Sequence, residues 1–134
     1  MSDANIDEWD DDADTDEDAV EELETYFANV YEYVDQWVLP RYRRKPGTVR
    51  WDPDWFENIE ALDRLEALWR AWEFYRLEGM TGMAVFWNDQ FNPTMYELTN
   101  PEGTFWYVQE YTGDEEQQKP VKLPSNRPPV EDLA

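Results

Sequence analysis

The sequence predicts an α+β fold, in which two long amphipathic helices pack on a three-stranded antiparallel β-meander. Up to about residue 75, apolar residues recur at three- and four-residue spacing, whereas short β-branched and aromatic runs follow from Met83 onward. Four of the eight tryptophans lie between Trp51 and Trp72. This aromatic surface requires a second element to cover it, and a length of 134 residues suits one domain.

Acidic residues are concentrated at the start of the chain. Residues 1–24 contain thirteen of the 32 acidic residues and no Lys or Arg, although the net charge of the whole chain is −21. Because such a run repels itself, residues 1–18 are predicted to be a disordered acidic arm. The folded unit is expected at residues 19–111, and residues 112–134 are expected to be an extended polar, Pro-rich tail.

The first helix is predicted to begin near Asp18, where carboxylates suit the positive end of the helix dipole. It is expected to stop at Leu39, because Pro40 disfavours α geometry in the residue before it. Its apolar stripe comprises Leu23, Tyr26, Phe27, Val30, Tyr33, Val34 and Trp37.

The second helix is predicted to start at Asp52 as N-cap, with Pro53 in the first helical position, or to break near Asn58 into a short and a long helix. Gly79 is expected to take the left-handed conformation after its end. The apolar face comprises Trp55, Ile59, Leu62, Leu65, Trp69 and Trp72, and the pairs Glu60–Arg64 and Glu66–Arg70 lie on another face.

The three strands of the meander are expected at residues 83–87, 95–99 and 104–109. Residues 91–93 and 100–103 contain Asn, Pro and Gly, which are typical of the turns between strands.

The residue types exclude several chemistries. The chain has no histidine and no cysteine, and its two serines, Ser2 and Ser125, fall in the predicted tails. The usual proton shuttle, thiolate nucleophile and Ser-His-Asp arrangement are therefore missing, and no Gly-rich phosphate loop occurs. No catalytic residue, metal site or cofactor is predicted. The sequence lacks a secretory signal and any apolar run of about 20 residues, so we expect a cytoplasmic protein that does not enter membranes.

Three carboxylates are the candidates for an enzymatic role. Asp52 and Asp54 flank Pro53, and Asp89 follows a tryptophan by two residues. In a functional interpretation, they form a cation site or an acid pair that cleaves a sugar bond. In a structural interpretation, they are a helix cap and a turn residue. Capping explains Asp-Pro-Asp fully, so we favour the second interpretation.

The loop between Pro40 and Trp51 is the only strongly basic stretch. Its cations either bind phosphate, with aromatic neighbours stacking on bases, or pair with carboxylates of the same chain, which is the interpretation we favour. One hypothesis is that the acidic arm folds over this loop. Deleting residues 1–18 should then raise nucleic-acid affinity in a salt-dependent way, and unchanged binding would refute the hypothesis.

The aromatic residues Trp69, Trp72, Tyr75, Phe86, Trp106 and Tyr107 line either a ligand groove or, as their spacing favours, the core. Because tryptophans are so numerous, Trp51 or Trp106 is expected to be an exposed anchor for a protein partner. The predicted partner-binding residues are Arg43, Arg44, Lys45, Arg50, Trp51 and Trp106.

The region from about Val30 to Val108 resembles the family called Domain of Unknown Function 4913, found in actinobacteria and their mobile elements. The residues that carry the resemblance are 37–44, Arg50-Trp51, Trp55-Phe56, the run 60–73, and Trp87-Asn88-Asp89 with Pro93 and Met95. The resemblance implies a role in plasmid transfer or phage-like elements. Relatives often carry a cysteine or histidines where this chain has Asp52, Asn58 and Gln90, so any metal site of those relatives is absent here.

These observations predict a non-enzymatic protein-interaction or accessory module of an actinobacterial mobile element. The first alternative is an acidic inhibitor, or DNA mimic, that occupies the nucleic-acid site of a host defence or DNA-processing enzyme. The second is a carboxylate- or metal-dependent enzyme. Binding of free nucleic acid is not expected, because a net charge of −21 repels it, and no oligomeric state is predicted.

Overall fold

Three helical stretches form the body of the chain in the computed structural model, which describes residues 24–45, 47–109 and 122–128. The first stretch is continuous and consists of α2 (Val30–Tyr33), the π-helical η1 (Val34–Val38) and α3 (Leu39–Arg41). The second is α4 (Ile59–Tyr75), preceded by the 3-10 turn η2 (Trp55–Glu57). The third consists of α5 (Gly82–Val85), the π-helical η4 (Phe86–Phe91) and α6 (Asn92–Thr99), preceded by the 3-10 turn η3 (Gly79–Thr81).

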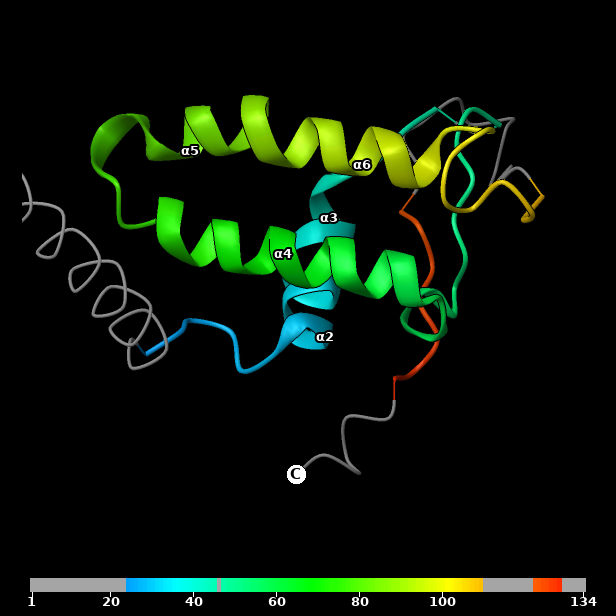
Figure 1. Cartoon of the computed structure of the whole chain (residues 1–134), viewed down its shortest axis with the longest axis horizontal. Coiled ribbons are helices and arrows are strands. Elements are labelled where there is room, and N and C mark those ends of the chain that lie inside the picture. Colours follow the sequence, from blue (N-terminus) through cyan, green and yellow to red (C-terminus); the bar gives the residue numbers. More distant parts are fainter. Residues whose placement is uncertain (1–23, 46, 110–121, 129–134) are drawn as a thin grey trace, which may run out of the picture.

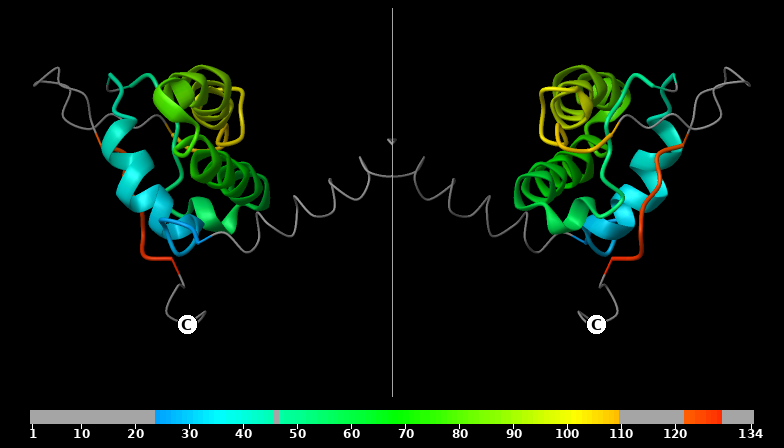
Figure 2. Two further views of the ribbon diagram at one scale, coloured as in Figure 1. Left: turned by 90° about the vertical axis from the view of Figure 1, so that its left-hand side faces the viewer. Right: turned by 90° about the vertical axis from the view of Figure 1, so that its right-hand side faces the viewer.

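The second and third stretches lie side by side and run in opposite directions, and the first stretch crosses behind them (Figure 1). The side views place the first stretch on one side of the interior and the other two on the opposite side (Figure 2). The connection after α4 turns at Gly79, whose φ of 70° confirms the predicted left-handed residue. No helix among the described residues has both the length and the apolar character needed to cross a bilayer.

The predicted β-meander is wrong, since no β-strand occurs among residues 24–45, 47–109 and 122–128. Residues 83–87 belong to α5 and η4, and residues 95–99 belong to α6. Residues 101–107 form successive turns instead of a third strand. The fold of the described residues is therefore helical.

The error has a physical cause in the third helical stretch. Its buried nonpolar positions are Gly82, Phe86, Phe91, Met95 and Leu98, separated by four, five, four and three residues. A π turn places residues five apart on one face, so Phe86 and Phe91 both point to the core across η4. The five-residue step interrupts the α-helical period, and the aromatic and β-branched residues around it then resemble strands.

Both π turns precede a proline that lies inside the helix. Leu39 donates its backbone N–H to Val34, and Asn92 donates to Trp87, each to the carbonyl five residues earlier. Pro40 and Pro93 follow directly. A proline lacks the N–H and its ring would collide with the carbonyl four residues back, and the wider π turn accommodates this within a continuous helix. The predicted stop at Leu39 is thus wrong, and the helix ends at Arg41.

The first helix also begins later than predicted. Asn29 is its N-cap, and the Asn29 side-chain oxygen accepts the backbone N–H of Glu32 at 2.9 Å. Residues 24–29 are not helical. The backbone N–H groups of Tyr26 and Phe27 instead bind the Glu73 carboxylate at 2.8 and 3.0 Å. Asp18 and the predicted acidic arm lie outside the described residues.

The start of α4 follows the alternative with a break near Asn58. Asn58 is the N-cap, and its side chain accepts the backbone N–H of Ala61 at 3.0 Å. Asp52 and Pro53 precede the 3-10 turn η2 and belong to no helix, so the predicted helix start there is wrong. The buried face of α4 comprises Ala61, Leu65, Leu68 and Trp72.

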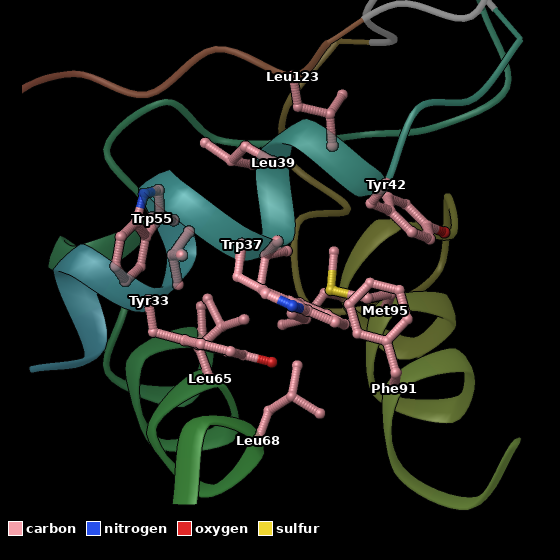
Figure 3. Close-up of a cluster of buried hydrophobic side chains, with 14 of the residues drawn as sticks. Tyr33, Trp37, Leu39, Tyr42, Trp55, Leu65, Leu68, Phe91, Met95 and Leu123 are labelled. Atoms are coloured by element: carbon pink, nitrogen blue, oxygen red, sulfur yellow. The ribbon is translucent and has the colours of Figure 1, made fainter. Parts of the chain in front are cut away.

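The core lies between the three helical stretches and is rich in aromatic rings (Figure 3). Trp37 contacts Trp72, Phe86 and Phe91, with ring centroids 5.9, 5.7 and 5.4 Å apart. Tyr33 stacks on Trp37 at 5.7 Å and 11°. Burial of such large rings supplies most of the driving force for folding. Phe86 is fully buried, so the preference for core packing over an aromatic groove is confirmed for Phe86.

The C-terminal segment 122–128 has no regular secondary structure but packs on the body. Leu123 is fully buried and enters the core (Figure 3). The Trp51 indole N–H donates to the Pro124 carbonyl at 2.7 Å, and the Trp55 indole N–H donates to Ser125 Oγ at 3.0 Å. This part of the predicted tail therefore closes one side of the folded body.

Candidate functional site

Arg50 is a structural residue of the basic loop. Its backbone N–H donates to the Thr99 carbonyl at 2.8 Å. Its Nη1 donates to the carbonyl oxygens of Trp106 and Val108 at 2.7 and 3.0 Å. Arg50 thus joins the end of the basic loop to the end of α6 and to the turns that follow, and it is not a free cation.

The two predicted tryptophan anchors differ in exposure. Trp51 is 1% exposed and packs edge-on against Phe105 at 5.2 Å, so the expectation that it is an exposed anchor is wrong. Trp106 is 64% exposed, and its neighbour Tyr107 is 48% exposed. Trp106 is accessible to a partner, and its backbone is fixed by Arg50.

Arg43, Arg44 and Lys45 form what we call the cationic segment. Arg43 Nε donates to the Pro40 carbonyl at 3.1 Å, and Arg44 Nη1 donates to the Arg43 carbonyl at 3.2 Å. The Lys45 carbonyl accepts Thr48 Oγ1 at 2.7 Å, which closes the turn. None of the three side chains lies within 4.0 Å of a carboxylate of the described residues. The interpretation that they pair with the chain's own acids is therefore wrong within this part of the chain.

Tyr42 anchors the cationic segment in the core. Its side chain is 5% exposed, and its hydroxyl lies 3.2 Å from Thr99 Oγ1. The ring packs edge-on against Phe91 at 5.8 Å, and the Arg44 guanidinium lies over the ring at 3.9 Å from its centroid. This cation–π contact holds Arg44 without neutralising it.

The arginines of α4 are arranged differently. Arg64 pairs with Glu60 at 2.8 Å, Arg70 with Glu66 at 3.5 Å, and Arg76 with Glu73 at 2.8 Å. The first two pairs confirm the predicted spacing of four residues. The Arg64 guanidinium is the first cause of the lowered pKa of Glu60, to which the Thr104 hydroxyl also contributes. The described residues contain fourteen acidic and ten basic side chains, and the cationic segment is one of the places where no described carboxylate pairs with the positive charge.

Two of the three candidate catalytic carboxylates, Asp52 and Asp54, already accept hydrogen bonds from nearby residues. Asp52 accepts the Asp54 backbone N–H at 2.8 Å and the Tyr107 hydroxyl at 2.7 Å. Asp54 accepts the Asn126 amide at 2.6 Å. Burial is the first cause of a raised pKa of Tyr107, and the contact with Asp52 adds to it. These bonds give both acids a structural role in joining the loop before α4 to residues 107 and 126. Asp89 is exposed.

No group of three or more His, Cys, Asp or Glu side chains among the described residues is arranged to hold a metal ion.

A second group of cations, which the predictions did not single out, lies between the first helix and the end of α4. We call it the two-arginine hollow, a concavity of about 410 Å³. The Arg41 guanidinium lies 4.5 Å from the centroid of Trp37, and that of Arg76 lies 5.8 Å from the centroid of Trp72. Gln36, Tyr26 and Phe27 complete the lining. The sequence signal is an arginine four residues after a tryptophan, which occurs in both helices.

Glu73 supports this hollow from the α4 side. Its carboxylate accepts the backbone N–H groups of Tyr26 and Phe27, the Trp69 indole N–H at 2.9 Å and Arg76 Nε at 2.8 Å. Burial acts to raise the pKa of Glu73, but these four donors outweigh burial and leave the pKa below its usual value of 4.5. Glu73 is thus an ionised anchor that attaches residues 26 and 27 to α4.

Two buried polar atoms near the hollow have no hydrogen-bond partner among the described residues. They are the Tyr33 hydroxyl and Trp72 Nε1. Desolvation is the main cause of a raised pKa of the Tyr33 phenol, so the phenol stays neutral. Both rings belong to the aromatic cluster beside the hollow, since Tyr33 stacks on Trp37 and its ring centroid lies 5.7 Å from that of Trp72.

Comparison with known proteins identifies the family. The model of the family described as Domain of unknown function (DUF4913) matches residues 27–129, and the chain therefore belongs to this family. This confirms the resemblance seen in the sequence. No curated protein and no solved structure matches the chain.

Proposed function

We propose that this member of the DUF4913 family is a non-catalytic interaction module that receives an acidic protein partner on the cationic segment. The observation that carries the proposal is the absence of any carboxylate within 4.0 Å of Arg43, Arg44 and Lys45 among the described residues, although the chain is strongly acidic. Exposed Trp106 supplies an aromatic anchor on the turn that Arg50 fixes. The module would act in the cytoplasm as an accessory component of a mobile element.

A protein partner fits the charge distribution better than free nucleic acid does. A net charge of −21 repels a nucleic acid at long range, whatever the local charge of the segment. An acidic patch on a protein carries a lower charge density than a phosphate backbone, so repulsion is weaker and contact with three cations can offset it. The cationic segment then determines which surface of the module faces the partner.

The second candidate function is an acidic inhibitor of a nucleic-acid-binding enzyme. The excess of negative charge in this chain favours it. Of the 32 acidic residues, eighteen lie outside the described part of the chain. A DNA mimic requires carboxylates fixed at phosphate-like spacing, and the described body, with fourteen acids and ten bases, does not supply such an excess.

A carboxylate-dependent enzyme is the third candidate. The chemistry would have to use Asp52 and Asp54, whose oxygens already accept bonds from Tyr107, Asn126 and the loop backbone. Replacing these acids should therefore alter stability. An activity lost on replacing Asp52, Asp54 or Asp89, with folding intact, would favour an enzyme.

The test compares two matched charge reversals by affinity capture from a host extract. The first variant is Arg43→Glu with Arg44→Glu, and the second is Arg64→Glu with Arg70→Glu, which changes the net charge equally on α4. The first variant should capture at least about tenfold less partner protein than the native chain. The second variant should capture as much partner protein as the native chain. Equal recovery by both variants would refute the proposal.

The same capture separates the second candidate function. If both variants capture a DNA-binding enzyme, and if DNA displaces that enzyme at moderate salt, the chain acts as an inhibitor through its acidic residues. A transfer or phage component that depends on Arg43 and Arg44 supports the accessory role.

A further inference from the structure

The two-arginine hollow brings together residues from separate parts of the chain. Trp37 and Arg41 come from the first helical stretch, and Trp72 and Arg76 come from the last turn of α4 and the residue after it. The centroids of the two indoles lie 5.9 Å apart. Packing of the first helix on α4 thus places two guanidinium groups beside one concavity.

The charge of the hollow is positive. Glu73 pairs with Arg76, and its carboxylate receives three further hydrogen bonds from Tyr26, Phe27 and Trp69. Arg41 lies within 4.0 Å of no carboxylate of the described residues. One unit of positive charge therefore remains uncompensated at the hollow.

Donor capacity also remains available. A guanidinium has five N–H donors in a planar fork. Arg41 uses Nη1 to bind the Trp37 carbonyl at 3.0 Å, and Arg76 uses Nε for Glu73 and Nη2 for the Glu24 carbonyl at 3.4 Å. Both guanidiniums therefore keep N–H groups that no described residue accepts.

Each guanidinium lies over an indole, Arg41 at 4.5 Å from the Trp37 centroid and Arg76 at 5.8 Å from the Trp72 centroid. Contact with a ring lowers the entropy that a long side chain loses when it binds a ligand. The N–H edge of a guanidinium can bind a planar oxyanion with two parallel hydrogen bonds. The volume of about 410 Å³ suits a small molecule.

We propose that the two-arginine hollow, lined by Trp37, Arg41, Trp72 and Arg76, binds a small dianion through both guanidiniums. The shared chemistry is a pair of negatively charged oxygens, from either a phosphate group or a dicarboxylate. The site is separate from the cationic segment, and the inference stands independently of the proposed function.

The experiment is isothermal titration calorimetry of the full chain with inorganic phosphate, pyrophosphate and succinate at low ionic strength. At least one probe should bind with a stoichiometry of one, and quenching of tryptophan fluorescence should accompany binding because two indoles line the site. The phosphate probes and succinate distinguish the two sources of oxyanion. No saturable binding of any probe up to 10 mM, a limit on the order of the weakest specific affinities, would overturn the proposal.

Arg41→Gln is the decisive variant, since it removes an exposed cation whose one internal bond is to the Trp37 carbonyl. It should weaken binding by about tenfold or more, because a charge-assisted hydrogen bond is lost. Arg70→Gln is the matched control, because it removes the same charge from α4 at a residue that does not line the hollow. Equal weakening by both variants would show a nonspecific charge effect and would overturn the site.

Two further variants keep the result interpretable. Arg76→Lys preserves charge but not the planar fork, and should weaken binding while near-ultraviolet circular dichroism stays native. Arg43→Glu with Arg44→Glu should lose the protein partner yet retain the dianion. Loss of the dianion in this last variant, with binding retained in Arg41→Gln, would assign the anion to the cationic segment and refute the hollow.

Discussion

The arginines of α4 and those of the cationic segment have the same chemistry but opposite surroundings. Arg64, Arg70 and Arg76 each contact a glutamate three or four residues earlier. Arg43 and Arg44 contact backbone carbonyls and the ring of Tyr42 instead. The difference shows how local sequence determines which cations a folded acidic chain leaves uncompensated.

The cause is the distribution of acids along the chain. Residues 36–51 contain five basic residues and no acidic residue. Cations there have no carboxylate at helical spacing, and folding brings none of the described carboxylates within 4.0 Å of them. On α4, by contrast, pairs at three- and four-residue spacing form without any tertiary contact.

Removing the most highly bonded acid of α4 should have the largest effect. Glu73→Gln should lower the free energy of unfolding by about 3 kcal/mol, because the carboxylate accepts four hydrogen bonds and compensates Arg76. Urea denaturation followed by tryptophan fluorescence measures it. Glu66→Gln, which breaks an exposed pair, is the control and should cost less than about 0.5 kcal/mol. Similar losses in both variants would contradict the role of Glu73.

Replacing Arg50 should have the next largest effect on stability, since Arg50 has a structural role and lies close in sequence to the cationic segment. Arg50→Met should cost about 2 kcal/mol, because the carbonyls of Trp106 and Val108 lose a charged donor. The same denaturation assay applies. If Arg50→Met lowers the free energy of unfolding by less than Arg43→Met does, Arg50 has no structural role.

Lowering the pH should reduce the free energy of unfolding through protonation of Glu73. Its pKa in the folded state lies below the usual 4.5, so its ionised form contributes stability above pH 4.5, and this contribution is lost as the pH falls through the folded-state pKa. The effect should be smaller than that of Glu73→Gln at neutral pH, because protonation leaves both oxygens in place. Unfolding free energies measured at intervals from pH 6 to pH 3 should fall less steeply in Glu73→Gln than in the native chain. Parallel curves would contradict this.

Neutralising the cationic segment should have the smallest effect on stability. The triple variant Arg43→Gln, Arg44→Gln, Lys45→Gln should lower the free energy of unfolding by no more than about 1 kcal/mol, because these side chains make no ion pair with the described carboxylates and only the contact of Arg44 with the Tyr42 ring is lost. A larger loss, measured by the same denaturation, would show that the segment stabilises the fold and would weaken its assignment as a binding surface.

Local signals in the sequence were predictive where no distant residue intervened. The pairs Glu60–Arg64 and Glu66–Arg70, the left-handed Gly79 and the break near Asn58 each depend on residues within four positions. The family resemblance was confirmed as well. In the candidate site, the exposure of Trp106 was predicted correctly, and the ring that it contacts belongs to its sequence neighbour Tyr107.

Distant contacts account for the failures. Trp51 was expected at the surface, but Phe105 and Pro124 cover it from positions more than fifty residues away. Tyr26 and Phe27 were expected inside the first helix, but their backbone N–H groups bind the distant Glu73 carboxylate instead. The β-meander was predicted because the π turn at Phe86–Phe91 shifts the spacing of the apolar residues by one position. In both helical stretches that contain a π turn, a proline lies two positions after the end of that turn.

The packing of residues 122–128 determines where the molecule can be shortened. A truncated version ending at residue 111 would lack Leu123 and would leave the indole N–H groups of Trp51 and Trp55 without acceptors. Solvent would then reach the side of the first helix that Leu39 occupies (Figure 3). Any minimal version for spectroscopy or crystallisation should therefore extend at least to Asn126, whose backbone N–H donates to Pro53 at 2.9 Å.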